Sequence, residues 1–322
     1  MAELVCCICG DPVGEQPKGI GGRVYCDRHY ARVTASRRGV WSSGVIQIAA
    51  LVVFVIIVEV ILSSTPLVLD QNGLVLAGVV LAIIPAVLWL TFFYAQDRLE
   101  PEPKGYIGGV FLLGGLLASA IGIPLLRDVF RTSDWLGSST VTTIFGSILV
   151  VGVVQEFLKY AAVRYSIYQS REFDERVDGI IYGTAAGLGY ATMLNIQFVI
   201  DSQGADLRAA MIRIVVTALA QASFSGITGY FLARAKFEEE PVWWLPSGVA
   251  LAAILNGVFT YVRGEITTTR LSLSSGGGFN PWPGLILATA VALAVLLLLG
   301  RLIQRANKIT LSGADTAQAN RA

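Results

Sequence analysis

One apolar run near the middle of the chain, residues 141–163, carries an acid and a base. The run is long enough to cross a bilayer, which takes about 20 helical residues. Glu156 and Lys159 lie well inside it and three residues apart, so a helix places both on one face, where they can pair. Unpaired, each charge would cost on the order of 2.5–3.5 kcal/mol at the bilayer centre. We therefore expect this face to point into a helical bundle or a polar cavity.

The rest of the chain supports this interpretation. It is 54% hydrophobic and only 15% charged, whereas soluble domains are about 25% charged. The sequence predicts an all-α fold, a polytopic transmembrane helix bundle of about eight spans. The net charge of +1 gives no indication of a nucleic-acid partner. The predicted spans are at about 44–62, 74–94, 107–126, 141–163, 179–200, 211–233, 243–262 and 283–303.

Lysine and arginine are concentrated before the first span, in the even-numbered connections and after the last span. Positively charged connections stay on the cytoplasmic side of a membrane. The sequence therefore predicts a multi-pass membrane protein with both termini in the cytoplasm. Glycines in the fifth span, Gly183 and Gly187 among them, should let neighbouring helices approach closely.

A cysteine cluster precedes the first span. Cys6 and Cys9 form one close pair and Cys26 and His29 a second, which matches a Cys3His zinc site. A segment of fewer than about 40 residues needs a metal or disulfides to fold. Two disulfides are the alternative, but a reducing cytoplasm favours Zn²⁺. A filled four-ligand shell indicates a structural ion, and Cys7 is spare by this count, although it could exchange with Cys6.

These patterns divide the chain into three parts. Residues 1–40 form a cytoplasmic zinc knuckle, similar to a LIM-like or treble-clef half-finger. Residues 41–305 form the membrane domain. Residues 306–322 form a flexible cytoplasmic tail, because the last dozen are small and polar.

Uncharged polar residues occur in four of the predicted spans. Such side chains often hydrogen-bond between helices, at about 0.6 kcal/mol each. They can also line a functional cavity, and both interpretations stay open. The residues are Gln155, Asn195, Gln197, Gln221 and Asn256.

The turn 97–103 resembles the D-R-x-E-P-E-P signature of the PrsW family of intramembrane proteases. Five further motifs follow in the family's order and cover about 92–261, which leaves the knuckle and the first span outside. They resemble E-E-x-x-K, D-G-hydrophobic2-Y-G, G-F-A-x-x-E-N, H-A-x-F-S-G-x-x-G-Y and H-x-x-x-N, at 155–159, 178–183, 189–195, 221–230 and 252–256.

The resemblance implies a glutamate and histidine centre, metal-dependent or glutamic, in a bacterial cytoplasmic membrane. This chain departs from it at most positions. Gln155 replaces the first glutamate, Leu194 the later one, and Gln221 and Ala252 both histidines. The family's identities remain at Glu156, Lys159, Asn195 and Asn256.

Metal-assisted hydrolysis needs about three protein ligands and an open position for water. The membrane part has neither histidine nor cysteine, so we expect no metal there. Glu156 could still act as a general base if burial raised its pKa, an effect that Lys159 opposes. Glu59 of the first span could supply another acid, although nothing in the sequence requires it.

Three functions are consistent with this pattern. The favoured one is a pseudoenzyme that binds a transmembrane protein or peptide segment in the former substrate groove, with the knuckle contacting a cytoplasmic protein. The second is an active intramembrane peptidase with a rearranged centre on Glu156. The third is a lipid or small-molecule conduit, although the matched broken helices of repeat-built transporters are missing.

Overall fold

The computed structural model describes residues 4–13, 18–20, 23–34, 38–64, 69–96, 104–204, 206–268 and 280–319. The prediction of a helical fold is confirmed there, and the only named strands of this part are two short ones in the knuckle. The elements are β1 Lys18–Ile20, β2 Arg23–Tyr25, α1 Asp27–Thr34, α2 Arg38–Ser64, α3 Gln71–Gln96, α4 Lys104–Leu117, η1 Ala118–Gly122, η2 Leu125–Val129, α5 Thr132–Trp135, α6 Thr140–Gly146, η3 Ser147–Gly152, α7 Val153–Ser166, α8 Asp178–Asp201, α9 Leu207–Phe237, α10 Trp244–Thr268 and α11 Trp282–Ala319.

Seven helical stretches of the described part are long and apolar enough to cross a membrane. They lie in α2, α3, the α4 to η2 segment, the α6 to α7 segment, α9, α10 and α11. The remaining predicted span corresponds to α8, a continuous helix of 24 residues that is not among the seven. Its glycines, tyrosines and threonines make it less apolar than its neighbours, and most of its residues are buried inside the bundle. The chain is therefore a multi-pass membrane protein.

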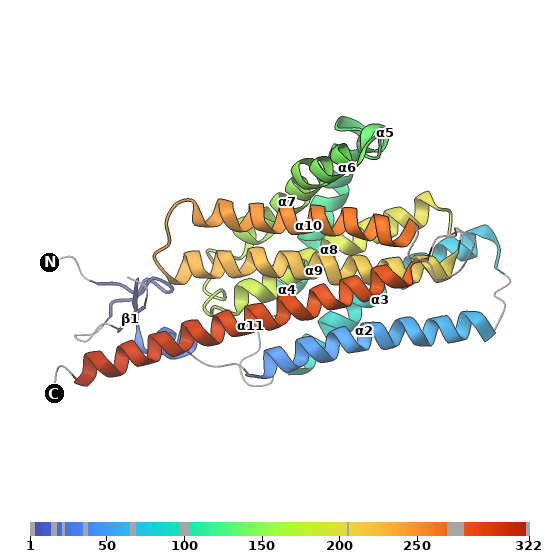
Figure 1. The fold of residues 1–322 in the computed structure, drawn as a ribbon. Coiled ribbons are helices and arrows are strands. Elements are labelled where there is room, and N and C mark those ends of the chain that lie inside the picture. The colour runs from blue at the N-terminus through green and yellow to red at the C-terminus, as the bar shows by residue number, and fades with distance from the viewer. Residues whose placement is uncertain are drawn as a thin grey trace.

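The helix α9 is the centre of the bundle (Figure 1). Of its most apolar window, 83% is buried inside the protein, against 22–33% for the other six candidate spans. It packs against α8, α10 and α11, and more weakly against α2, α3 and α7. A residue on almost any face of α9 therefore contacts protein and not lipid, which lets this helix carry polar side chains.

The closest packing in the bundle joins α8 to α9, through glycine. A Cβ atom on Gly183 would overlap the carbonyl oxygen of Ser225, and one on Gly187 would lie 2.5 Å from that of Gln221. The backbones thus touch directly where only glycine leaves room. The prediction of close approach at these two glycines is confirmed.

Three π-helical segments lie between or after the helices α4, α6 and α7. The segment η1 follows α4 directly, and η3 joins α6 to α7. The π-helix is rare and often marks functional sites. Gly122 at the end of η1 gives room to the Tyr190 hydroxyl, and Gly152 at the end of η3 lies against the carbonyl oxygen of Ala253 in α10.

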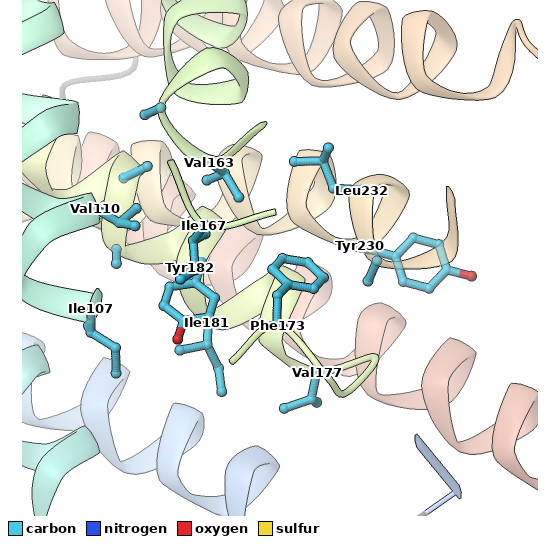
Figure 2. Close-up of a cluster of buried hydrophobic side chains, with 14 of the residues drawn as sticks. Ile107, Val110, Val163, Ile167, Phe173, Val177, Ile181, Tyr182, Tyr230 and Leu232 are labelled. Atoms are coloured by element: carbon cyan, nitrogen blue, oxygen red, sulfur yellow. The ribbon is translucent and has the colours of Figure 1, made fainter. Parts of the chain in front are cut away.

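One hydrophobic cluster fills the bundle around the connection from α7 to α8 (Figure 2). Phe173 of this connection is fully buried, with Tyr182 of α8 and Phe237 of α9 stacked against it. The connection is therefore part of the core and not a loose surface loop.

The knuckle lies at the same end of the bundle as the C-terminal end of α11 (Figure 1). Its strands pair antiparallel, with Gly19 opposite Val24. The helix α11 continues to Ala319 and so runs into the segment 306–322 that the sequence predicted as a flexible tail.

Candidate functional site

A buried polar network joins three helices in the interior of the bundle. It consists of Gln155, Glu156 and Lys159 of α7, Gln221 of α9 and Asn256 of α10. Glu156 is fully buried and Lys159 is 2% exposed, so neither reaches lipid or water by itself. The sequence predicted that the two charges would share one face of a helix that points inward, and the structure agrees.

Lys159 is the centre of this network. Its ammonium group donates to Glu156 Oε1 over 2.6 Å and, with a second hydrogen, to Gln221 Oε1. The spacing of three residues along α7 brings the first pair together, and α9 supplies the second acceptor. Charge and counter-charge are thus matched inside the protein, which removes most of the desolvation penalty that either would carry alone.

The amides of the network satisfy one another. Gln155 Oε1 accepts from Gln221 Nε2 over 2.9 Å and from Asn256 Nδ2 over 3.0 Å. Asn256 Nδ2 also donates to Glu156 Oε1 over 2.7 Å. Each amide oxygen of Gln155 and Gln221 therefore already receives a nitrogen donor. The network connects α7, α9 and α10 as interhelical hydrogen bonds do in other membrane bundles.

Two buried oxygens beside the network have no hydrogen-bond partner among the described residues. They are Glu156 Oε2 and the hydroxyl of Tyr190. Tyr190 belongs to α8, and its ring centroid lies 5.8 Å from Lys159 Nζ. Sequence reasoning did not single out Tyr190, because tyrosine in a glycine-rich span reads as ordinary packing. Gly122 leaves space for the Tyr190 hydroxyl, but this contact can be recognised only once the fold is known.

Other predicted site residues lie outside the network. Asn195 Nδ2 donates over 3.1 Å to the backbone oxygen of Ile214 in α9. Leu194 is half-buried in an apolar cluster around Tyr190, and Ala252 is buried in a separate apolar cluster. Leu194 and Ala252 thus contribute to apolar packing, and Asn195 bonds α8 to α9. The turn 97–103 lies outside the described residues.

The acid of the first span does not join the network either. Glu59 forms an ion pair with Arg208, whose side chain is 51% exposed, at the opposite end of α9 from the knuckle. The possibility that Glu59 supplies a second catalytic acid is therefore not realised in this structure.

The cysteine cluster has the geometry of a metal site. One ligand atom from each of Cys6, Cys9, Cys26 and His29 lies within 4.8 Å of all the others. The Cys26 and Cys9 sulfur atoms are 4.0 Å apart, and His29 Nδ1 is 3.1 Å from Cys26 Sγ. None of the four cysteines forms a disulfide, and Cys7 is exposed. This set matches tetrahedral Zn²⁺ ligation in number and type.

The electrostatics of these thiols also suit a cation. Burial works against ionisation of Cys6, but backbone N–H groups from Cys26, Cys9 and Ile8 lower its pKa. Burial raises the pKa of Cys9 to about 12, and the neighbouring Cys6 adds to this rise. Two thiolates so close together repel, and a bound divalent cation removes that repulsion and deprotonates both.

Comparison with known proteins places this geometry in context. A family model described as PrsW family intramembrane metalloprotease matches residues 102–279. Protease PrsW of Bacillus subtilis (strain 168) is 30% identical over 182 residues, which is 56% of this chain and 79% of that protein. Protease PrsW of Geobacillus kaustophilus (strain HTA426) is 30% identical over 181 residues, 56% of this chain and 76% of that protein. No solved structure matches the chain.

The bundle and its buried site thus define a multi-pass membrane protein with a polar network in its interior. The chain belongs to the PrsW family, as its motifs predicted. The matched region contains the polar network and excludes the knuckle, which lies before residue 102.

The residues of the network do not fit the metal that the family's description implies. Glu156 is its only carboxylate, and Glu156 Oε1 already accepts from Lys159 and Asn256. The Gln221 side-chain oxygen accepts from the same ammonium group. A hydrolytic zinc needs about three ligands and an open position for water, whereas the network offers one carboxylate and amide oxygens that are already hydrogen-bonded.

Proposed function

We propose that this PrsW-family protein does not hydrolyse peptides and instead binds a transmembrane segment of another protein. The observation that carries the proposal is the composition of the buried network, in which Glu156 is the only carboxylate and the amides Gln155 and Gln221 stand at a glutamate and a histidine position of the family's motifs. One carboxylate whose Oε1 already accepts from Lys159 and Asn256 cannot by itself hold a metal ion with its water. The network then serves to hold three helices together around the former substrate groove.

An apolar ridge next to the network supports the binding role. Phe145, Leu149, Val153 and Phe157 follow at every fourth position along α6, η3 and α7, and all four are exposed in the isolated chain. Residues at this spacing form one stripe on a helix. A partner helix packed on this stripe would contact α7, the helix that also carries Gln155 and Glu156.

The knuckle adds a second function to the proposal. Cys6, Cys9, Cys26 and His29 would hold one structural Zn²⁺, and the exposed side of the knuckle near Cys7 would contact a cytoplasmic protein. Both termini would lie in the cytoplasm of a bacterial cell, as the distribution of lysine and arginine predicts. The bacterial origin of the PrsW relatives supports this location.

The binding proposal is tested with site-directed photocrosslinking. A photoreactive residue is placed at Leu149 or Phe157 in the full chain, in the native membrane, with Val242, which is 96% exposed on the connection before α10, as the matched control position. We expect one membrane protein to be crosslinked from the ridge and not from Val242. If the ridge yields only lipid adducts, the proposed partner does not exist.

A second candidate function follows from Glu156 Oε2, a buried carboxylate oxygen without a partner among the described residues. Such an oxygen can accept a proton from water, so a peptidase with a rearranged centre is chemically conceivable. The test is cleavage of transmembrane peptides by the purified chain and by Glu156→Gln. Our proposal requires no cleavage by either, whereas cleavage that disappears in the variant establishes the peptidase.

A further inference from the structure

The knuckle is packed against the membrane domain and not simply tethered to it. Tyr25 is 1% exposed, and its hydroxyl donates to the backbone oxygen of Phe237, at the end of α9, over 2.7 Å. Ile8 and Tyr30 pack against the same hydrophobic cluster as Phe173. A segment too small for its own core therefore uses the end of the bundle as part of its core.

His29 connects the two parts chemically. Its Nδ1 atom faces the thiols, 3.1 Å from Cys26 Sγ and 3.6 Å from Cys6 Sγ. Its Nε2 atom faces the other way, 3.8 Å from Asp174 Oδ2. The side chains of His29 and Asp174 are each only 8% exposed, so this contact is sheltered from water. Nδ1 thus faces the thiols, while Nε2 faces a carboxylate at the distance of an ion pair.

Asp174 is held in position by the start of α8. Its backbone N–H and that of Glu175 donate to Asp178 Oδ2, over 2.8 Å and 2.5 Å. Asp178 is fully buried and is the first residue of α8. Phe173 anchors the other side of Asp174, because its ring stacks on that of Tyr182 (Figure 2) and on that of Phe237. The carboxylate that meets His29 is therefore supplied by the core of the membrane domain.

We propose that Asp174 is the outer partner of the metal site, so that metal binding and docking of the knuckle on the membrane domain are one coupled equilibrium. This inference rests on the zinc site of the proposed function. A metal-bound histidine commonly donates its second ring N–H to a carboxylate, which fixes the ring and makes the ligand nitrogen more basic. Here that carboxylate belongs to a different domain from the four ligands.

Contacts through His29 and Asp174 would therefore connect the metal site to the start of α8. An ion bound by Nδ1 orients the His29 ring toward Asp174, and Asp174 is bonded through its backbone to Asp178 at the start of α8. Loss of the ion, or oxidation of the thiols that hold it, frees the ring and removes one of the contacts that order this connection. By reciprocity, anything that disturbs the docked connection weakens metal binding by the same factor.

The test is the zinc affinity of the purified full chain, measured by competition with a chelator of known affinity. We expect Asp174→Asn to bind Zn²⁺ about 10–100 times more weakly than the wild type, the usual effect of losing such a partner. Glu172→Gln, in the same connection but without a contact to the knuckle ligands, is the matched control and should bind like the wild type. Asp174→Glu should recover part of the loss.

A second variant keeps the inference testable if Asp174→Asn folds poorly. Tyr25→Phe removes the hydroxyl that bonds Phe237 but leaves the four ligands and Asp174 in place. Removal of one docking hydrogen bond should weaken zinc binding about 2- to 10-fold. Hydrogen exchange adds an independent readout, because zinc should slow exchange of the amides at 174 and 175 in the wild type and do so less in Asp174→Asn.

The outcomes separate the two proposals. If the wild-type chain binds no zinc, the metal site itself is wrong. If the wild type binds zinc but Asp174→Asn and Tyr25→Phe bind it equally well, the site exists and the coupling to the membrane domain is refuted.

Discussion

The knuckle and the polar network each gather a small set of chemically active side chains, but they do so with opposite chemistry. The knuckle brings together three thiols and an imidazole with their ligand atoms within 4.8 Å, a set whose thiols a divalent cation would ionise and neutralise. The network brings together one carboxylate, one ammonium group and three amides, and its charges already cancel. The knuckle ligands suit a bound metal cation, whereas the network already contains a cation, the Lys159 ammonium group.

This difference indicates where the chain can use a metal. Thiolate and imidazole ligands hold Zn²⁺ strongly, whereas a lone carboxylate with amides does not. The family model described as an intramembrane metalloprotease matches the membrane region of this chain, yet among the described residues only the N-terminal segment before that region offers a group of Cys and His that could hold a metal. The candidate metal ligands of this chain therefore lie outside the region that matches the family.

The strongest test of this comparison removes one knuckle ligand. Cys26→Ser should abolish zinc binding and unfold the knuckle, because structural zinc supplies about 10–16 kcal/mol of apparent folding free energy in zinc-finger peptides. Elemental analysis of the purified chain should show about one zinc per chain before the change and none after it.

Cys7→Ser is the matched control for that change, because Cys7 is exposed beside the cluster and is not one of its four ligands. It should retain the zinc. A metal that stays bound in Cys26→Ser would have to lie elsewhere, and the distinction between the two regions would then be wrong.

Removal of the Lys159 ammonium group should have the next largest effect, on the stability of the bundle. Lys159→Met leaves Glu156 charged, fully buried and without its counter-charge, and breaking such a pair costs about 3–5 kcal/mol. Thermal unfolding in detergent measures the loss. The double variant Glu156→Gln with Lys159→Met should recover much of it, since no unpaired charge remains. Equal destabilisation by the single and double variants would mean that an unpaired charge on Glu156 is not the cause of the loss.

A substitution that disturbs the packing of α4 on α8 should lower stability by a smaller amount. A Cβ on Gly189 would overlap the carbonyl oxygen of Phe111, so Gly189→Ala should destabilise the bundle by about 1–3 kcal/mol. Gly108→Ala is the control, because no atom lies within 4 Å of its added methyl group and alanine favours helix. Thermal unfolding compares the two, and Gly189→Ala should leave the zinc content unchanged. A neutral Gly189→Ala would show that α4 and α8 can separate freely.

The smallest effect is expected at the peripheral ion pair of Glu59 and Arg208. Because the Arg208 side chain is 51% exposed, Glu59→Gln should change stability by less than about 1 kcal/mol. The same unfolding measurement applies, at low and high salt. A loss as large as that of Lys159→Met would show that burial does not distinguish the two ion pairs.

Much of this protein follows from its sequence. Long apolar runs predict the helices, because backbone groups in lipid must bond within their own segment. The spacing of Cys6, Cys9, Cys26 and His29 predicts the metal cluster, since short-range spacing limits how far ligands can separate. The spacing of Glu156 and Lys159 predicts their contact, because helix geometry fixes neighbours three residues apart.

Contacts between helices were decided only by the tertiary structure. Helix periodicity says which residues share a face, but the rotation and depth of each helix decide which faces meet. Thus Asn256 enters the network while Asn195 bonds the backbone of α9 instead, although both are asparagines of family motifs. The position of Asp174 against His29 is likewise invisible in the sequence, because 145 positions separate them and only the packing of the knuckle on the bundle brings them together.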